Sequence, residues 1–289
     1  MGARTNTLPA RCFAEVLGTY ILIFFGCGVV HASVLTGAQG GLWQVAIVWG
    51  VAIMLAVYVV GGISGAHINP AITLALATWG RFSWKEVIPY TASQLAGAFL
   101  AAATLFALFH GFLAETESKH RVIRGQPGSE ITAMCYGEYF PSPGPLASTP
   151  SNYDPEAHAA LNRLISESGA FVAELLGTLF LALVVFAVTD EHNLAAPTGR
   201  LAPVFIGLDV AILISVLAPL TQACFNPARD FGPRLFAFFA GWGTIAIPGR
   251  GTGFLTVYIL APLLGAILGG GLYVRLLRPC LPEPPKGED

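Results

Sequence analysis

Charged residues are scarce in this 289-residue sequence, in which Asp, Glu, Lys and Arg together make up 11% of the chain. Soluble globular proteins carry about 25% charged residues, so this chain has too little polar surface for a domain folded in water. Hydrophobic residues reach 54%, and the net charge of −2 at pH 7 argues against nucleic acid as a partner. The shortage of charge therefore indicates a membrane protein embedded in a lipid bilayer.

Metal-binding and nucleophilic groups are also few. The five cysteines are scattered, with neither the spacing of a metal site nor a disulfide framework. No nucleophile stands in a recognisable arrangement with a general base, so we expect no catalytic residues, no metal, no cofactor and no enzymatic activity. The cysteines are Cys12, Cys27, Cys135, Cys224 and Cys280.

Long apolar runs take the place of the missing charge. A helix crosses about 30 Å of hydrocarbon with about 20 residues, and six runs of the chain are long enough to do so. We therefore predict an all-α membrane protein whose six transmembrane helices form a single domain over residues 1–289. The runs cover residues 12–35, 42–63, 84–110, 168–189, 201–220 and 253–277.

The distribution of Lys and Arg predicts the orientation of the chain. Six spans put both termini on one side, and the short connections on that side carry Lys and Arg, which makes it cytoplasmic. Residues 111–167 then form a long extracytoplasmic loop with an irregular Pro/Ser-rich surface segment. The absence of an Asn-x-Ser/Thr sequon favours a bacterial inner membrane, with a eukaryotic plasma membrane as the alternative. The cytoplasmic cations are Arg4, Arg11, Arg81, Lys85, Arg200, Arg275 and Arg278.

The two halves of the chain repeat each other. Three motifs recur in the same order and at almost the same spacing, which predicts repeat one over residues 10–110 and repeat two over residues 168–278. Each half holds three spans, so the second copy must be inverted, and such repeats place their site at the repeat interface near the midplane. The paired motifs are AEVLGT 14–19 with AELLGT 173–178, NPA 69–71 with NPA 226–228, and LAGA 95–98 with LLGA 263–266.

Each NPA motif predicts the start of a short helix. Asn is a good N-cap and Pro is favoured at the first helical position, so the motifs should open half-helices over about 70–79 and 227–239. Neither half-helix can span the membrane, and the non-helical backbone before it is tolerated only where it lines a cavity. Inverted symmetry brings the two ends together around a pore. The motif residues are Asn69, Pro70, Ala71, Asn226, Pro227 and Ala228.

The midpoint of this pore should exclude charge. Both half-helices point their positive ends at it, which repels cations and protons, and the amides of Asn69 and Asn226 can donate to a passing oxygen. The segments before the motifs would line one wall with carbonyl acceptors opposite an apolar wall, which suits a linear polyol. These carbonyls belong to Gly65, Ala66, His67, Gln222, Ala223 and Cys224.

At these residues the sequence resembles a known family. SGAHINPA (64–71) and NPARDFGPR (226–234) on inverted repeats are similar to the motifs of the major intrinsic protein (aquaporin) family, and the NPARD continuation resembles its aquaglyceroporin branch, that of the bacterial glycerol facilitators. The resemblance covers about residues 10–278. It implies a passive channel for glycerol and other small uncharged solutes together with water, closed to ions and protons and assembled as a homotetramer.

Arg229 is the most costly residue of the second motif, because a charged side chain at membrane depth costs about 2.5 to 3.5 kcal/mol and is a functional candidate by default. The resemblance places it at the constriction, where it donates to solute hydroxyls. It assigns the other filter positions to Trp49, Ile214 and Ala223. The glycerol facilitator type has a glycine at position 214 and an aromatic residue at 223. The set found here is instead similar to a subgroup of plant nodulin-26-like channels that pass water and glycerol.

Three acidic residues are expected to support the loops before the half-helices. Glu15 and Glu174 form a symmetric pair that should accept hydrogen bonds from freed backbone N–H groups, with a proton relay as the alternative. Asp230 should pair locally with Arg234. Asp209 has no evident partner in the sequence, and its position on the helix favours a subunit or helix contact over contact with solute.

Other functions use part of the same architecture. A mainly water-selective channel, or one for urea, ammonia or metalloid hydroxides, would keep every motif named above. An ion-coupled secondary transporter also uses inverted repeats and broken helices, but it needs intramembrane charges near the midplane for coupling. Only Asp209 and the two paired glutamates are candidates for that role. A transporter would saturate and respond to an ion gradient.

Overall fold

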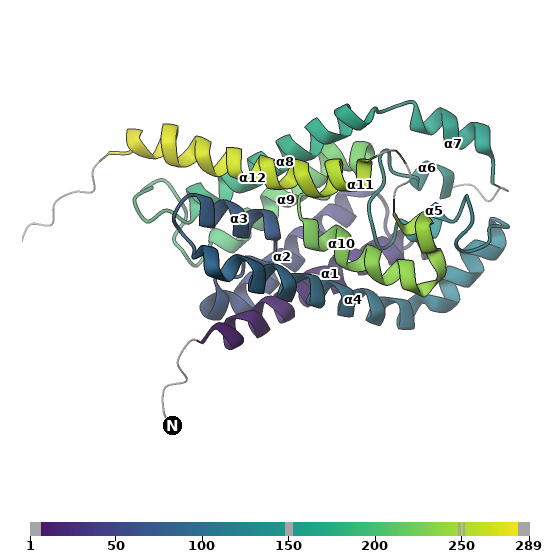
Figure 1. Cartoon of the computed structure of the whole chain (residues 1–289), viewed down its shortest axis with the longest axis horizontal. Helices are drawn as coiled ribbons and strands as arrows, with labels where there is room; N and C mark the ends of the chain where they lie inside the picture. Colours follow the sequence, from purple (N-terminus) through teal and green to yellow (C-terminus); the bar gives the residue numbers. More distant parts are fainter. Residues whose placement is uncertain (1–6, 148–152, 248–249, 251, 283–289) are drawn as a thin grey trace, which may run out of the picture.

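The computed structural model describes residues 7–147, 153–247, 250 and 252–282, and the described part is helical throughout, without a strand. Six of its helices are long and apolar enough to cross a membrane, as predicted, and Figure 1 shows them side by side in one bundle. Five are continuous: α1 (Leu8–Thr36), α2 (Leu42–Ser64), α4 (Trp84–Lys119), α8 (Glu167–Val188) and α9 (Ala202–Thr221).

The sixth span, Gly253–Cys280, is built from several helical pieces. Two of them have wider π-helical turns, which depart from the uniform helix that its hydropathy predicts. In order they are α11 (Gly253–Leu255), η3 (Thr256–Leu260), α12 (Ala261–Gly271), η4 (Leu272–Leu277) and η5 (Arg278–Cys280).

Two short helices complete the bundle. They begin at the prolines of the two NPA motifs, and Asn69 and Asn226 stand before them in extended conformation as N-caps. In Figure 1, α3 lies toward the end of the bundle that holds both described chain ends, whereas α10 runs toward the opposite end. They are α3 (Pro70–Thr78) and α10 (Pro227–Ala237), the latter followed by the turns η1 (Phe238–Trp242) and η2 (Gly243–Ala246).

Glycines set the closest helix crossings. A Cβ atom on Gly97 of α4 would collide with the carbonyl of Val16 in α1, and one on Gly265 of α12 would collide with the carbonyl of Leu175 in α8. Gly97 and Gly265 are the glycines of the LAGA and LLGA motifs, so the third repeated motif allows the same close packing in both halves. Small residues serve this purpose at helix interfaces in membranes because they let backbones approach.

The segment 111–167, predicted as a long loop with an irregular Pro/Ser-rich stretch over residues 142–156, contains helical and buried parts; residues 148–152 of that stretch lie outside the described residues. Residues 111–119 continue α4, and residues 131–140 are buried against the bundle. Residues 131–140 are buried because this stretch is rich in apolar and aromatic residues that can cover the ends of the spans. Its short helices are α5 (Glu130–Ala133), α6 (Gly144–Ala147) and α7 (Pro155–Asn162).

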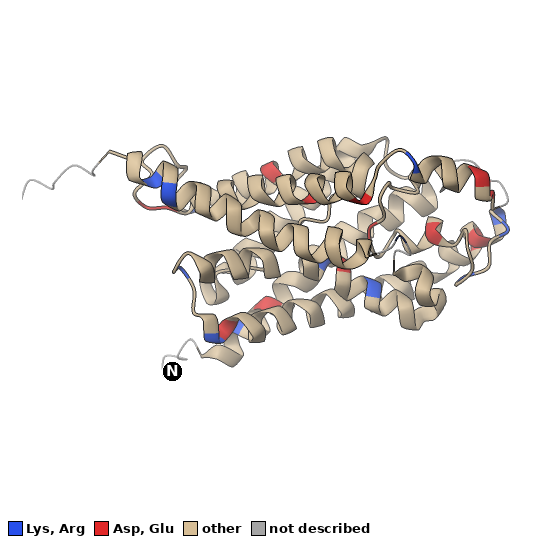
Figure 2. Ribbon diagram, turned by 45° about the horizontal axis from the view of Figure 1, so that its top comes forward, with Lys and Arg blue, Asp and Glu red and all other residues tan. Residues whose placement is uncertain are grey.

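Charged side chains gather at the two ends of the bundle. Figure 2 shows most Lys, Arg, Asp and Glu residues there, with long uncharged stretches of helix between them. This distribution is that of a protein whose middle lies in hydrocarbon, where an unpaired charge is costly. The few charged residues in the middle of the bundle are therefore candidates for the functional site.

Candidate functional site

The two half-helices meet through their capping asparagines. The Oδ1 atom of Asn69 accepts from the amide of Ala71 at 2.8 Å, and that of Asn226 accepts from the amide of Ala228 at 3.0 Å. Each side chain also donates across the centre: Asn69 Nδ2 to the carbonyl of Phe225, and Asn226 Nδ2 to the carbonyl of Ile68, both at 2.9 Å. A primary amide has two donors, so each asparagine keeps one N–H for a molecule in the cavity that both line.

The backbone before each motif is held in an uncommon conformation. Positive φ angles at non-glycine residues cost about 1 to 3 kcal/mol each and persist only where the surroundings enforce them. This conformation ends the helical hydrogen-bond pattern, whose last bonds are those of the Gly65 and Gln222 amides to Gly61 and Ala218. The residues with positive φ in the two segments are Gly65, Ala66, Ile68, Gln222, Ala223 and Phe225.

Two fully buried glutamates hold these segments in place. Glu15 accepts from the amides of His67 and Ile68 at 2.9 and 2.7 Å, and also from the side chains of Ser64 and Gln94. Glu174 accepts from the amides of Cys224 and Phe225 at 2.9 and 2.8 Å. Each carboxylate thus satisfies the freed N–H groups of one segment with both of its oxygens, which is the geometry of a scaffold.

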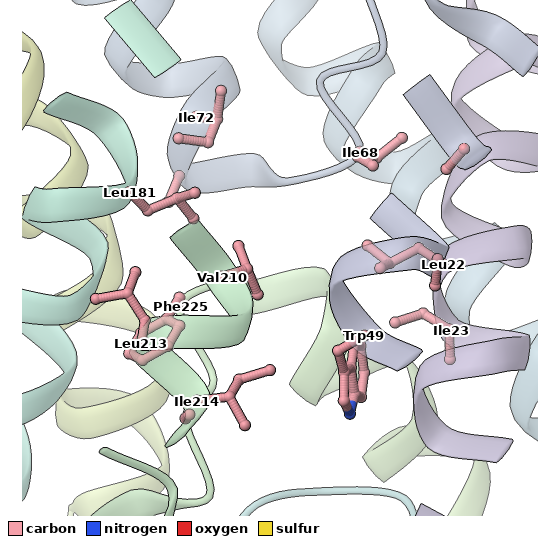
Figure 3. Packing of buried hydrophobic residues seen from close by; sticks show 14 of the residues in the cluster. Leu22, Ile23, Trp49, Ile68, Ile72, Leu181, Val210, Leu213, Ile214 and Phe225 are labelled. Atoms are coloured by element: carbon pink, nitrogen blue, oxygen red, sulfur yellow. The ribbon is translucent and has the colours of Figure 1, made fainter. Parts of the chain in front are cut away.

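A cavity of about 660 Å³ leads from the asparagines toward the bundle end that holds both described chain ends. Its lining includes residues 65–68, which precede the first motif, together with many aliphatic side chains. Figure 3 shows Leu22, Ile72, Leu181 and Val210 facing a common space. The polar side chains of Tyr58, Thr189 and Arg200 also line the cavity, which therefore combines hydrogen-bonding groups with a larger aliphatic surface. Its aliphatic lining is Leu22, Ile53, Val57, Ile72, Leu76, Leu181, Val185, Ile206 and Val210.

The four expected filter residues are absent from the lining of this cavity. Ile214 of α9 and Trp49 of α2 point toward each other in Figure 3, and the Arg229 guanidinium lies over the Trp49 ring at 4.3 Å from its centroid. Gly26 makes room for this ring, because a Cβ atom there would collide with it. Ala223 is also buried, at the end of α9. Trp49, Ile214 and Arg229, which are far apart in the sequence, thus lie close together.

Arg229 has a partner that the sequence analysis missed. Its Nη1 atom forms an ion pair with Glu138 and lies 3.4 Å from the carbonyl of Tyr136. Glu138 is fully buried and belongs to the segment 111–167 that was predicted as a long loop. The signal that could have found it is a single acid between aromatic residues in the stretch CYGEYF (135–140), because a charge in such surroundings needs a partner.

Asp230 and Arg234 form a second buried ion pair next to the first. Arg234 Nε donates to Asp230 at 2.9 Å, its Nη2 atom binds Asp230 and the carbonyl of Glu138, and its Nη1 atom binds the carbonyl of Ala246. Asp230 also accepts from the amide of Glu138 at 2.9 Å. The pair therefore fastens the segment around Glu138 to α10, in addition to the local pairing that the sequence predicts.

The remaining candidates lie apart from the pore. The Cys224 thiol is buried 3.3 Å from the carbonyl of Asn226, and Cys224 is absent from the cavity lining. Asp209 is absent from the cavity lining, and its Oδ2 atom has no hydrogen-bond partner among the described residues. Within the described ranges, no cluster of three His, Cys, Asp or Glu side chains could hold a metal ion.

Comparison with known proteins finds relatives that match nearly the whole chain. The family model described as "Major intrinsic protein" matches residues 3–273. The glycerol uptake facilitator protein of Haemophilus influenzae is 41% identical over 278 residues, which cover 96% of this chain and 97% of the relative. That of Escherichia coli (strain K12) is 40% identical over 281 residues, 97% of this chain and 92% of the relative. The propanediol uptake facilitator of Citrobacter freundii is 40% identical, with 96% and 95% covered.

A solved structure shares the fold. The X-ray structure of the aquaglyceroporin from Plasmodium falciparum superimposes with a TM-score of 0.79 at 24% identity, covering 95% of this chain and 99% of that chain. At this identity the likeness concerns the fold. Together with the family match over nearly the whole sequence, it shows that the chain is an integral, multi-pass membrane protein of the major intrinsic protein family.

Proposed function

We propose that this protein is a passive channel that conducts glycerol and other small uncharged solutes together with water. The observation that carries the proposal is the division of the cavity lining into hydrogen-bonding groups, among them residues 65–68 and the two asparagines, and aliphatic side chains. A linear polyol has the same division, with hydroxyls on one side and carbon on the other. It can exchange its water hydrogen bonds for protein ones while its carbon chain slides along the apolar wall.

The names of the relatives support this choice of solute. Proteins about 40% identical over almost their whole length are called glycerol uptake facilitators, and others at the same identity are called propanediol uptake facilitators. Both solutes are short polyols. The second candidate, a mainly water-selective pore, is favoured by the bulk of Ile214 opposite Trp49.

Selectivity is proposed to arise at two levels. Trp49, Ile214, Ala223 and Arg229 form the constriction, where Trp49 supplies an apolar wall and Arg229 donates to hydroxyls. At the centre, Asn69 and Asn226 each offer one free N–H, and the positive ends of α3 and α10 oppose cations and protons. Ions are excluded because the aliphatic wall cannot replace their hydration. No catalytic step, metal or cofactor takes part.

The membrane arrangement is part of the proposal. Residues 10–110 and 168–278 are two inverted repeats of one channel domain, both termini face the cytoplasm of a bacterial inner membrane, and the 111–167 segment faces outward. The chain assembles as a homotetramer with one pore per subunit. Asp209, on α9 and without a partner among the described residues, is a candidate for a contact between subunits.

Stopped-flow light scattering of proteoliposomes tests the function directly. Vesicles with the protein, and empty vesicles of the same lipid, are mixed with glycerol or with sucrose at equal osmolarity. We expect shrinkage in both, faster than in empty vesicles, and rapid re-swelling in glycerol with a rate linear in its concentration. Saturation, or a response to an imposed proton or sodium gradient, would instead identify a transporter. Fast water flux without glycerol entry would identify a water channel.

A further inference from the structure

Arg229 lies in a buried cluster of acidic and basic groups. Four titratable side chains from two segments, Glu138, Arg229, Asp230 and Arg234, form this cluster at the outer side of the filter, and each is at most 6% exposed. Two acidic groups face two guanidinium groups there. The constriction is therefore not the isolated positive site that its arginine predicts from sequence.

We infer that Glu138 is a specificity-determining member of the constriction, which positions the Arg229 guanidinium and cancels its charge so that neutral hydroxylated solutes pass. This inference rests on the proposed channel function. It adds to the filter a residue from the long segment between α4 and α8, which supplies none of the filter positions expected from the sequence.

The position of Glu138 is determined by the pore-forming elements. Its amide donates to Asp230 and its carbonyl accepts from Arg234, both on α10. The next amide, that of Tyr139, donates to the side chain of Gln222 at the end of α9 at 2.9 Å. Gly137 packs directly against the Arg234 guanidinium, where a Cβ atom would lie 2.7 Å from Cζ. The backbone around Glu138 thus follows the half-helix and the filter rather than an independent loop.

The backbone hydrogen bonds described above hold the segment in place without the Glu138 side chain. The side chain itself forms an ion pair with Nη1 of Arg229. This ion pair lies at one edge of the guanidinium fork, which is planar and rigid, so a contact there restrains the orientation of the whole group. With Trp49 under its face, Arg229 is held from two sides.

Removal of the Glu138 charge should change the filter in two ways. The guanidinium would carry an uncompensated charge in a site with little water, so it would bind solute oxygens and anions more strongly. It would also lose the contact that keeps it at the wall, and it could move into the space between Trp49 and Ile214. Both effects oppose glycerol more than water, because glycerol is larger and makes several hydrogen bonds at once.

The test compares Glu138→Gln with the wild type in proteoliposomes, and uses Glu156→Gln as the matched control. Glu156 lies on the same extramembrane segment, is exposed and makes no side-chain contact that the structure records. We expect the ratio of glycerol to water permeability to fall about fivefold or more in Glu138→Gln, by analogy with other buried specificity contacts. Nitrate flux should rise, whereas the control should keep the wild-type ratio and nitrate flux.

A second comparison, in an Arg229→Val background, distinguishes a positioning role of Glu138 from a purely structural one. In Arg229→Val, the further change Glu138→Gln should alter the ratio by less than about twofold, because its partner is gone and the two effects are coupled. A ratio in Glu138→Gln equal to that of the wild type overturns the inference, and so does an equal fall in both backgrounds. If Glu138→Gln fails to assemble, Glu138→Asp replaces it. That variant keeps the charge but withdraws it by one methylene, and an unchanged ratio then overturns the inference.

The two proposals fail differently. A wild-type protein that excludes glycerol contradicts the channel proposal, and the Glu138 inference is then decided by water and nitrate flux alone: unchanged fluxes in Glu138→Gln overturn it. A wild type that conducts glycerol, with a Gln variant of the same selectivity, contradicts only the role of Glu138.

Discussion

Ile214 is the residue at which the size of the constriction is most open to test. It faces Trp49, and the small Ala223 lies buried at the end of the same helix. We predict that Ile214→Gly raises glycerol permeability about fivefold, since it removes a branched side chain from the proposed constriction. Stopped-flow re-swelling in glycerol measures this.

Ala223→Phe is the opposite change and should lower glycerol permeability while water flux persists. If Ile214→Gly leaves the re-swelling rate unchanged, the constriction lies elsewhere and the Trp49–Ile214 pair is only a wall of the pore.

Glu174 offers a test of how much one buried hydrogen-bond acceptor contributes to stability. Its two oxygens accept hydrogen bonds from the amides of Cys224 and Phe225. In Glu174→Gln, an NH2 group would face one of these amides. A buried amide left without an acceptor costs about 1 to 3 kcal/mol, so we predict a lower thermal unfolding temperature in detergent together with slower conduction.

Glu15→Gln is the symmetric counterpart and should behave in the same way, because Glu15 accepts from two amides of the first segment. Unfolding temperatures equal to that of the wild type in both variants would contradict the scaffold role and return the proton-relay alternative to consideration.

At the scale of single elements, the segments before the half-helices fit against glycines of the long helices. A Cβ atom on Gly177 of α8 would collide with the Phe225 ring, and one on Gly18 of α1 would lie 2.8 Å from Ile68. We predict that Gly177→Ala destabilises the protein by about 1 to 3 kcal/mol, the usual cost of overpacking, and slows conduction because Asn226 follows Phe225 directly.

Gly111→Ala is the control for this change. It lies within α4 and has open space around the position of a Cβ atom, so only helix propensity changes and stability should be equal or slightly higher. Equal stability of the two alanine variants would show that the Phe225 ring can move aside at little cost.

Asp190, directly after α8, connects three elements at the end of the bundle. It pairs with Arg81 after α3 and with Arg278 of η5, and it accepts from the Tyr273 hydroxyl at 3.0 Å. Burial by itself would raise the pKa of this carboxyl, but hydrogen bonds from His192 and Tyr273 and the charge of Arg278 outweigh it, so the pKa lies below its ordinary value.

A depressed carboxyl pKa gives the sign of the pH dependence. The stabilisation by Asp190 is fully present above the ordinary aspartate pKa of about 4 and is lost as the pH falls through the lower folded-state value. We predict that Asp190→Asn lowers the unfolding free energy at pH 7 by about 2 kcal/mol, with the difference from wild type shrinking in acid. A difference that is constant from pH 7 into acid would contradict the ion pairs as its cause.

At the scale of the whole molecule, a native cysteine reports the orientation. Cys280 is exposed at the end of the last span, whereas Cys27, Cys135 and Cys224 are buried. In a Cys12→Ala background we predict that a membrane-impermeant maleimide labels the protein in inside-out vesicles and not in intact cells. Labelling from the outside would place the termini on the extracytoplasmic side.

Much of the architecture could be predicted because its signals are local or periodic. Six apolar runs fix the spans within a few residues, and Asn-Pro pairs fix where the half-helices start, since capping depends only on neighbouring residues. The support by Glu15 and Glu174 follows from the cost of burying an unpaired carboxylate, and the structure gives both of them backbone partners. The end of α4 and the irregular last span were less predictable, because hydropathy marks the hydrocarbon boundary and not the helix end.

The sequence by itself determined the membrane class, the pair of half-helices and the asparagines that cap them. Each of these depends on hydropathy, spacing or capping over short distances along the chain. Only the tertiary structure decided that Glu138 meets Arg229 and that Arg234 binds a carbonyl 96 positions away. The physical reason is that a charge pair buried between distant segments leaves no periodic pattern, and which acid reaches which guanidinium depends on how the chain returns over the end of the bundle.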